Sequence, residues 1–107
     1  MGLFGNSKQE REIKALMTKA AETMQNLIDE VPQKHVSPLA KYYINQFAAE
    51  VNSLYEKSSN LSAAKNMSIQ VIIEGQPMSL VSAKLAFARF MSDFTRQTGE
   101  KFPLKYN

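Results

Sequence analysis

A chain of 107 residues with an apolar fraction of 44% and a charged fraction of 21% is typical of one globular domain with a modest core. The absence of cysteine excludes disulfide bonds, thiolate metal sites and cysteine nucleophiles, and it fits a reducing, cytoplasmic setting. No apolar run approaches the roughly 20 residues that cross a bilayer, so we expect no membrane span.

The net charge of +3 arises entirely in the second half of the chain. Residues 1–58 contain seven Lys or Arg and seven Asp or Glu, whereas residues 59–107 contain six and three. A surplus of this size is typical of a solubilising surface and gives weak support for an anionic partner.

The first elements expected are a flexible tail over residues 1–6 and a long helix that begins at Ser7. Ser7 and Glu10 have the spacing of a capping box, in which each side chain bonds the main-chain N–H of the other residue. Pro32 ends this helix. Its buried face is expected to hold the apolar residues that recur at spacings of four and three, namely Ile13, Met17, Ala20, Met24, Leu27 and Val31.

Ser37 and Pro38 predict the start of a second helix, because serine caps a helix and proline suits its first turn. Since the preceding loop is short, the two helices should form an antiparallel hairpin over residues 7–58. Residues 58–60 should weaken the second helix, but Leu61 stays in phase with it, so ends near 58 and near 64 both remain open. The apolar face of this helix holds Ala40, Tyr43, Ile44, Phe47, Ala48, Val51, Leu54 and Tyr55.

The stretch from Ser68 to Glu74 predicts a short strand, because apolar and polar residues alternate along it. One face of the strand carries Ile69, Val71 and Ile73, and the other carries Ile72. Glu74 and Gly75 can turn the chain, and Pro77 suits an edge because it lacks an N–H. The sequence therefore predicts a small β element, a strand or a hairpin, near residues 69–78.

Ser79 is placed to cap a third amphipathic helix over residues 80–98, and Gly99 follows where a C-terminal cap belongs. The buried face of this helix is expected to hold Leu80, Ala83, Phe87, Phe90, Met91 and Phe94. Residues 99–107 then form a C-terminal tail. Because Phe102, Leu104 and Tyr106 alternate with other residues, this tail is also a candidate for a short strand beside residues 69–73.

Together these elements predict a mostly α fold: an antiparallel helical hairpin plus a third amphipathic helix, with the small β element between the second and third helices. Residues 7–98 would form a single helical domain. Two strands alone are marginal in water, so the β element must pack on the helices or pair with a second copy of the chain.

No arrangement of residues in the sequence points to catalysis, a cofactor or a metal ion. His35 is the one histidine, and no second histidine or cysteine can complete a zinc site or a catalytic triad. The carboxylate pairs Glu10/Glu12 and Asp29/Glu30 point in different directions, because neighbours at such spacings do not share a helix face. We therefore expect no enzyme activity, and no catalytic, cofactor-binding or metal-binding residues.

Two groups of residues are candidates for contact surfaces. Four large or basic side chains fall on faces expected to be wet, where arginine and tyrosine often carry binding energy: Tyr42, Leu85, Arg89 and Arg96. The predicted strand is the second candidate, since it contains no Lys or Pro that would block pairing of its edge. A two-fold dimer would use Ile69, Val71, Ile72 and Ile73.

The sequence therefore favours a small non-enzymatic protein-interaction module that binds another protein and associates with itself as a homodimer. The alternative is a nucleic-acid-binding protein that uses the basic second half, with Arg89, Arg96, Lys101 and Lys105 as its contacts. This alternative is less favoured, because nucleic-acid binders usually show denser basic clusters and no known binding motif is present.

Overall fold

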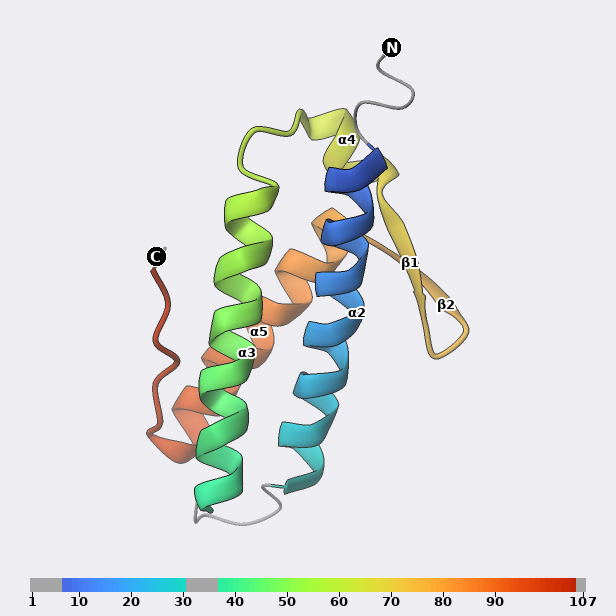
Figure 1. Ribbon diagram of the computed structural model, residues 1–107. Coiled ribbons are helices and arrows are strands. Elements are labelled where there is room, and N and C mark those ends of the chain that lie inside the picture. Colours follow the sequence, from blue (N-terminus) through green and yellow to red (C-terminus); the bar gives the residue numbers. More distant parts are fainter. Residues whose placement is uncertain (1–6, 31–36, 106–107) are drawn as a thin grey trace.

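The computed structural model of the chain describes residues 7–30 and 37–105. It consists of helices α2 (Ser7–Glu30), α3 (Pro38–Lys57) and α4 (Ala63–Ser68), strands β1 (Gln70–Ile73) and β2 (Gln76–Ser79), and helix α5 (Leu80–Thr98). Figure 1 shows α2 and α3 side by side and antiparallel, with α5 crossing behind them and the hairpin of β1 and β2 beside α2. The predicted mostly α fold is confirmed. The predicted flexible tail over 1–6 and His35 lie outside the described residues.

Polar contacts join the end of α2 to the start of α3. Ser37 caps α3 as predicted, because its Oγ accepts a hydrogen bond from the Ala40 N–H at 3.0 Å. The Ser37 hydroxyl also donates to the Glu30 carboxylate at 3.3 Å. The predicted antiparallel hairpin is confirmed by the arrangement of α2 and α3 (Figure 1), and the Ser37–Glu30 hydrogen bond joins the two helices directly.

Both predicted caps of α5 are present. Ser79 Oγ accepts from the Ser82 N–H at 3.1 Å, and Gly99 takes the left-handed conformation, with φ +81°, that ends the helix. Phe87 and Phe94 are buried and Phe90 is half-buried, so the predicted phenylalanine stripe faces the helical pair.

A short helix that the sequence did not predict follows α3. α3 ends near 58, where the Ser58 hydroxyl donates to a carbonyl of the preceding turn at 2.7 Å. α4 then begins at Ala63, because Ser62 Oγ accepts from the Lys65 N–H at 3.1 Å. The six residues of α4 include no buried side chain, so no apolar period could have revealed the helix.

Glu10 ties α4 to the first turn of α2. Its carboxylate lies 3.6 Å from Lys65 Nζ and 3.5 Å from Lys14 Nζ. The sequence assigned this carboxylate to a capping box with Ser7, whose side chain lies outside the described residues. Both ion pairs are partly exposed, so each contributes a modest free energy of about 0.2 to 1 kcal/mol.

The β element is a hairpin with a two-residue turn. β1 pairs with β2 in antiparallel register, and Glu74 and Gly75 form the turn with φ values of +50° and +80°. Positive φ at both positions defines a type I′ turn, which matches the twist of the strands but strains a residue other than glycine or asparagine. β1 is shorter than predicted, because Ser68 belongs to α4 and Ile69 follows as its C-terminal cap.

One face of the hairpin packs on the helices. Val71, Ile73 and Met78 are half-buried against the core, whereas Ile72 on the opposite face is 66% exposed. The predicted alternation of faces is therefore confirmed. Packing on the helices, rather than pairing with further strands of the described chain, supports the two strands.

The core lies between α2, α3 and the inner face of α5. Its largest fully buried apolar side chains are Phe47, Phe87, Ile13, Met17, Leu27, Leu54, Ile69, Leu80 and Val51. Glu50 is also buried, at 8% exposed; Gln46 donates to its Oε2 at 3.1 Å, while its Oε1 has no hydrogen-bond partner among the described residues. An unsatisfied buried acceptor destabilises a fold by roughly 1–3 kcal/mol.

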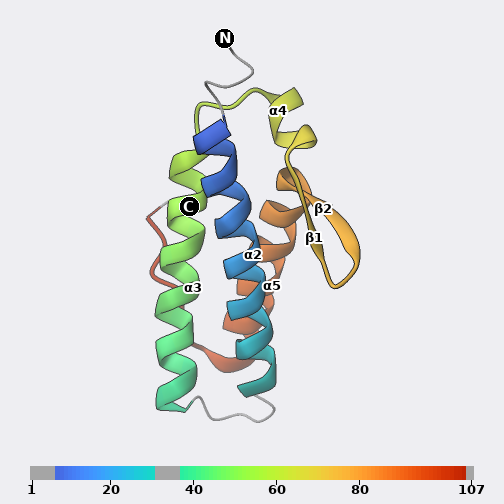
Figure 2. The same cartoon turned by 45° about the vertical axis from the view of Figure 1, so that its right-hand side comes forward.

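The described part of the C-terminal tail, residues 99–105, is not a strand. The chain instead reverses after α5 and runs back along α3 (Figures 1 and 2). Phe102 and Leu104 pack against the core. Their spacing suggested a strand because every second residue of an extended segment faces the same way, whether or not the segment pairs with another.

The turn strain predicts that Glu74→Asn will stabilise the protein. Asparagine tolerates the left-handed region better than glutamate, so we expect the free energy of unfolding to rise by about 0.5–1 kcal/mol. Chemical denaturation followed by circular dichroism would measure the change.

Gly75→Ala is the matched control for the same turn. A Cβ at Gly75 meets nothing within 4 Å, so its cost reports backbone strain alone. We expect a loss of about 1 kcal/mol. Unchanged stability in both variants would contradict the type I′ geometry.

Candidate functional site

The outer side of α5 carries three of the four residues predicted to form a contact surface. Leu85 is 61% exposed, and Arg89 and Arg96 are exposed as well. Arg96 Nη2 contacts Asp93 Oδ1 at 2.8 Å, whereas Arg89 forms no ion pair with a described residue. The sequence spacing of these residues aligns their side chains along one side of the helix.

An apolar groove of about 490 Å³ lies beside this side of α5. Its lining comes from three segments: Tyr55 of α3; Ala88, Met91, Ser92 and Thr95 of α5; and Lys101, Phe102 and Leu104 of the tail. Leu85 precedes Ala88 and Ser92 by about one and two helical turns. The exposed leucine therefore lies about one turn beyond the residues of α5 that line the groove.

The tail forms a wall of the groove because a side chain of α3 holds its main chain. Asn52 Nδ2 donates to the Pro103 carbonyl at 3.2 Å, and Asn52 Oδ1 accepts from the Lys105 N–H at 2.9 Å. One amide side chain thus satisfies an acceptor and a donor of the tail, as a neighbouring strand would.

Phe102 anchors the same tail in the core. Its ring centre lies 5.8 Å from that of Phe47 on α3 and 5.4 Å from that of Phe94 on α5. The rings meet edge to face, a favoured geometry for aromatic pairs. The tail therefore closes the space between α3 and α5 and leaves the groove on its outer side.

Lys84 stands one helical turn before Ala88, next to Tyr55. Its Nζ lies 5.9 Å from the centre of the Tyr55 ring and donates to Asn66 Oδ1 at 2.9 Å. Partial burial lowers the pKa of the Lys84 ammonium and raises the pKa of the Tyr55 phenol, because water is withdrawn from both groups. No described carboxylate forms an ion pair with Lys84.

Tyr42, the fourth predicted contact residue, is 61% exposed but lies apart from the groove. It sits on α3 13 residues before Tyr55, a distance of about 20 Å along the helix axis. The structure therefore brings Leu85, Arg89 and Arg96 together and leaves Tyr42 on a separate surface.

The four residues predicted for a dimer interface differ in exposure. Ile69 is 2% exposed and belongs to the core, so it is not available to a second copy of the chain. Val71 and Ile73 are half-buried beneath the hairpin. Ile72 alone among the four is an exposed side chain.

Pro77 blocks the outer edge of the hairpin. The Leu80 N–H donates to the Ile69 carbonyl at 2.8 Å, so these two residues form a hydrogen-bonded pair. Hydrogen-bonded and non-hydrogen-bonded pairs alternate along an antiparallel ladder, which makes Ile72 and Pro77 a non-hydrogen-bonded pair. The Pro77 nitrogen thus points to the outer edge, where it offers no N–H. Figures 1 and 2 place β1 between α2 and β2, so the edge with the proline is the one that faces outward.

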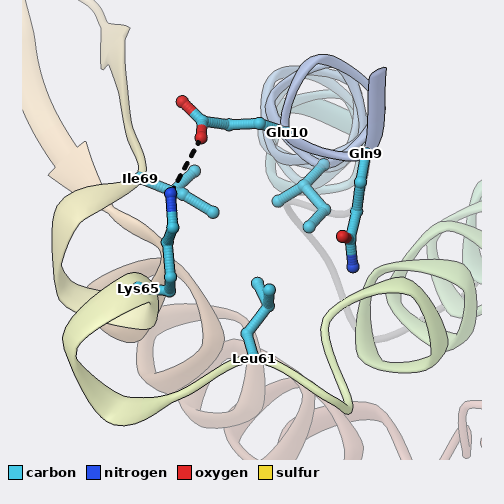
Figure 3. A pocket seen from close by; sticks show the side chains of 6 residues that line it. Gln9, Glu10, Leu61, Lys65 and Ile69 are labelled. Atoms are coloured by element: carbon cyan, nitrogen blue, oxygen red, sulfur yellow. Dashed lines mark ion pairs between the residues drawn. The ribbon is translucent and has the colours of Figure 1, made fainter. Parts of the chain in front are cut away.

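A second depression lies where α2 meets α4, with a volume of about 10 Å³. Figure 3 shows Leu61 and Ile69 pointing into the space beneath α2, while Glu10 reaches across to Lys65. A volume of this size holds at most one water molecule, so the depression is a packing feature and not a ligand site.

The sequence did not predict the groove, although the part of it that α5 forms follows a helical pattern. The groove residues of α5 recur at helical spacing: Ala88, Met91, Ser92 and Thr95. The tail wall gave only the alternation of Phe102 and Leu104, which made the tail a candidate for a short strand. Asn52 gave no local signal, because its partners are 51 and 53 residues away.

Within residues 7–30 and 37–105, no group of three or more His, Asp or Glu side chains could hold a metal ion. None of the described helices is long and apolar enough to cross a membrane. No protein-family model matches the chain, and no curated protein or solved structure matches it.

Asn52→Ala is predicted to release the tail. The variant loses both hydrogen bonds to the tail, so we expect the free energy of unfolding to fall by about 1–2 kcal/mol. Faster hydrogen exchange at residues 101–105 would locate the effect. Asn52→Asp is the matched control, since it keeps an acceptor for the Lys105 N–H but cannot donate to Pro103. An Asn52→Ala variant with unchanged exchange in the tail would contradict this role.

Proposed function

We propose that this protein is a small non-enzymatic interaction module that binds another protein through the outer side of α5 and the adjoining groove. The observation that carries the proposal is the position of Leu85, which is 61% exposed and lies one helical turn before Ala88, a residue that lines an apolar groove of about 490 Å³. Burying a leucine side chain is worth roughly 1.5–3 kcal/mol, so a partner that covers this residue gains affinity from it.

The residues around Leu85 support the same proposal. Arg89 and Arg96 follow Leu85 along the same side of α5, and Tyr55 lines the groove. Arginine and tyrosine are enriched among residues whose truncation weakens binding between proteins. An apolar centre with a polar and cationic rim is the usual arrangement of such an interface.

Self-association is the second part of the proposal. Ile72 supports it, because a β-branched side chain that is 66% exposed on a hairpin loses contact with water when two copies meet. The contact would involve the exposed face of the hairpin, since the outer edge carries Pro77. We place this activity in the cytoplasm, as the cysteine-free sequence favours.

Nucleic-acid binding is the alternative function. Arg89, Arg96, Lys101 and Lys105 are all exposed, which supports contacts to phosphates. Binding through so few phosphates would be weak and strongly dependent on salt. Sub-micromolar, sequence-dependent binding to a duplex at ~150 mM salt would replace the protein-interaction proposal with this alternative.

Photo-crosslinking in the native cell tests the main proposal. A photoreactive amino acid at Ala88 should capture a protein, and the purified partner should then bind wild-type protein directly. Leu85→Asp should weaken that binding by at least about tenfold, since it removes an apolar contact and adds a charge.

Leu39→Asp is the matched control, because Leu39 is an exposed leucine of α3 at 47%. It should leave the affinity unchanged, and circular dichroism should show both variants folded. Equal loss of binding in the two variants, or no effect of Leu85→Asp, would contradict the assignment of the binding surface.

Self-association is tested by sedimentation at micromolar concentration. We expect a mass of twice 12.1 kDa, and Ile72→Lys should reduce it to one chain without loss of helical circular dichroism. A wild-type mass of one chain that is unchanged on concentrating would contradict this part of the proposal.

A further inference from the structure

The groove beside α5 has a lysine toward each end and no carboxylate in its lining. Lys101 lines it near the C-terminal end of α5, and Lys84 lies next to Tyr55 at the other end. Neither lysine forms an ion pair with a described residue. The nearest ion pair on α5 joins Arg96 to Asp93, so this acid is already engaged.

We infer that the groove binds an acidic amphipathic helix of a partner protein, with carboxylates of that helix meeting Lys84 and Lys101. This inference rests on the proposed function and names the chemistry of its partner. The partner's apolar residues would cover Ala88, Met91 and Leu85, and its acidic residues would flank them.

The floor of the groove suits a helix. Ala88 and Ser92 are small and exposed, and they lie one turn apart on α5. Small side chains let two helix axes approach to about 8 Å, while a partner's larger side chains fill the space beside them. Met91 of α5 and Phe102 and Leu104 of the tail line the groove, and they provide apolar contacts for one helix face.

The tail does not suit an added strand. The Leu104 N–H donates to the Phe102 carbonyl at 2.8 Å, and Pro103 and Lys105 bond the Asn52 side chain. Main-chain groups that are already paired cannot form the ladder on which strand addition depends. A helix, which satisfies its own main chain, does not need such groups.

The two lysines favour acidic groups on the partner. Lys84 is partly withdrawn from water and has a neutral amide and a tyrosine ring as neighbours. A partner carboxylate would supply the countercharge to Lys84. The attraction between the two charges would be stronger here than on the open surface, because the surroundings of Lys84 are less polar. The residues of α5 from Lys84 to Thr95 extend over about 16 Å, so a partner helix of about three turns would run along them.

A displayed library of helical peptides tests the inference. Each peptide has about 14 residues, with leucines at i, i+4 and i+7 and with flanking positions that vary among Glu, Lys and Gln. Selection on the wild-type protein should enrich Glu at the flanking positions. Amide shifts of residues 84–104 should change when a selected peptide binds.

Charge variants of the protein provide the second measurement. Lys101→Met and Lys84→Met should each weaken a selected peptide by at least about fivefold, and Lys84→Glu combined with Lys101→Glu should reverse the selection toward Lys. Lys101 is exposed in the tail, so its variant tests the inference even if Lys84→Met disturbs the fold. Lys19→Met, at an exposed lysine of α2, is the matched control and should leave the affinity unchanged.

The outcomes separate this inference from the proposed function. Binders that map to the groove without a preference for Glu would overturn the acidic partner but leave the interaction surface in place. Selection of no binder, or of binders that map elsewhere, would contradict both. Shifts at the groove that appear on concentrating the free protein would assign the groove to a second copy and overturn the inference.

Discussion

Phe47 is the side chain on which the arrangement of the outer elements depends. It is fully buried on α3, and its ring meets Phe87 and Phe90 of α5 and Phe102 of the tail at centre distances of 5.5, 5.6 and 5.8 Å. Two segments, α5 and the tail, thus share one aromatic partner on α3. Because large rings fill the space between them, α3 and α5 do not pack as closely as α2 and α3 do.

The separation of α3 from α5 makes room for the tail, and the tail in turn creates the groove. If the two helices packed directly, Tyr55 and Ala88 would be covered and no apolar surface would remain open between them. The same aromatic cluster that stabilises the fold therefore also shapes the surface proposed for binding. Phe102 contributes both to the stability of the fold and to the groove, because its ring packs against Phe94 and the same residue lines the groove.

Local chemistry determined what could be predicted from the sequence. Ser37, Ser79 and Gly99 act within one helical turn, so their caps and the helix ends they define were predictable. Exposed Leu85 was predictable from helical phase for the same reason. The tail was not, because Asn52 reaches it across almost half of the chain length and amide side chains carry no sequence period.

The proline of β2 bears on how the folded protein behaves when it is concentrated. The run of Val71, Ile72 and Ile73 has the β-branched, uncharged character of segments that stack into fibrils. Stacking needs a strand whose main-chain edge is open to another chain. The outer strand, β2, has Pro77 at its free edge, where an N–H is missing. The inner strand, β1, pairs with β2 on one side and lies toward α2 on the other. The folded hairpin therefore cannot template a growing sheet. An aggregation-prone segment is protected here by the geometry of its neighbours rather than by its own composition.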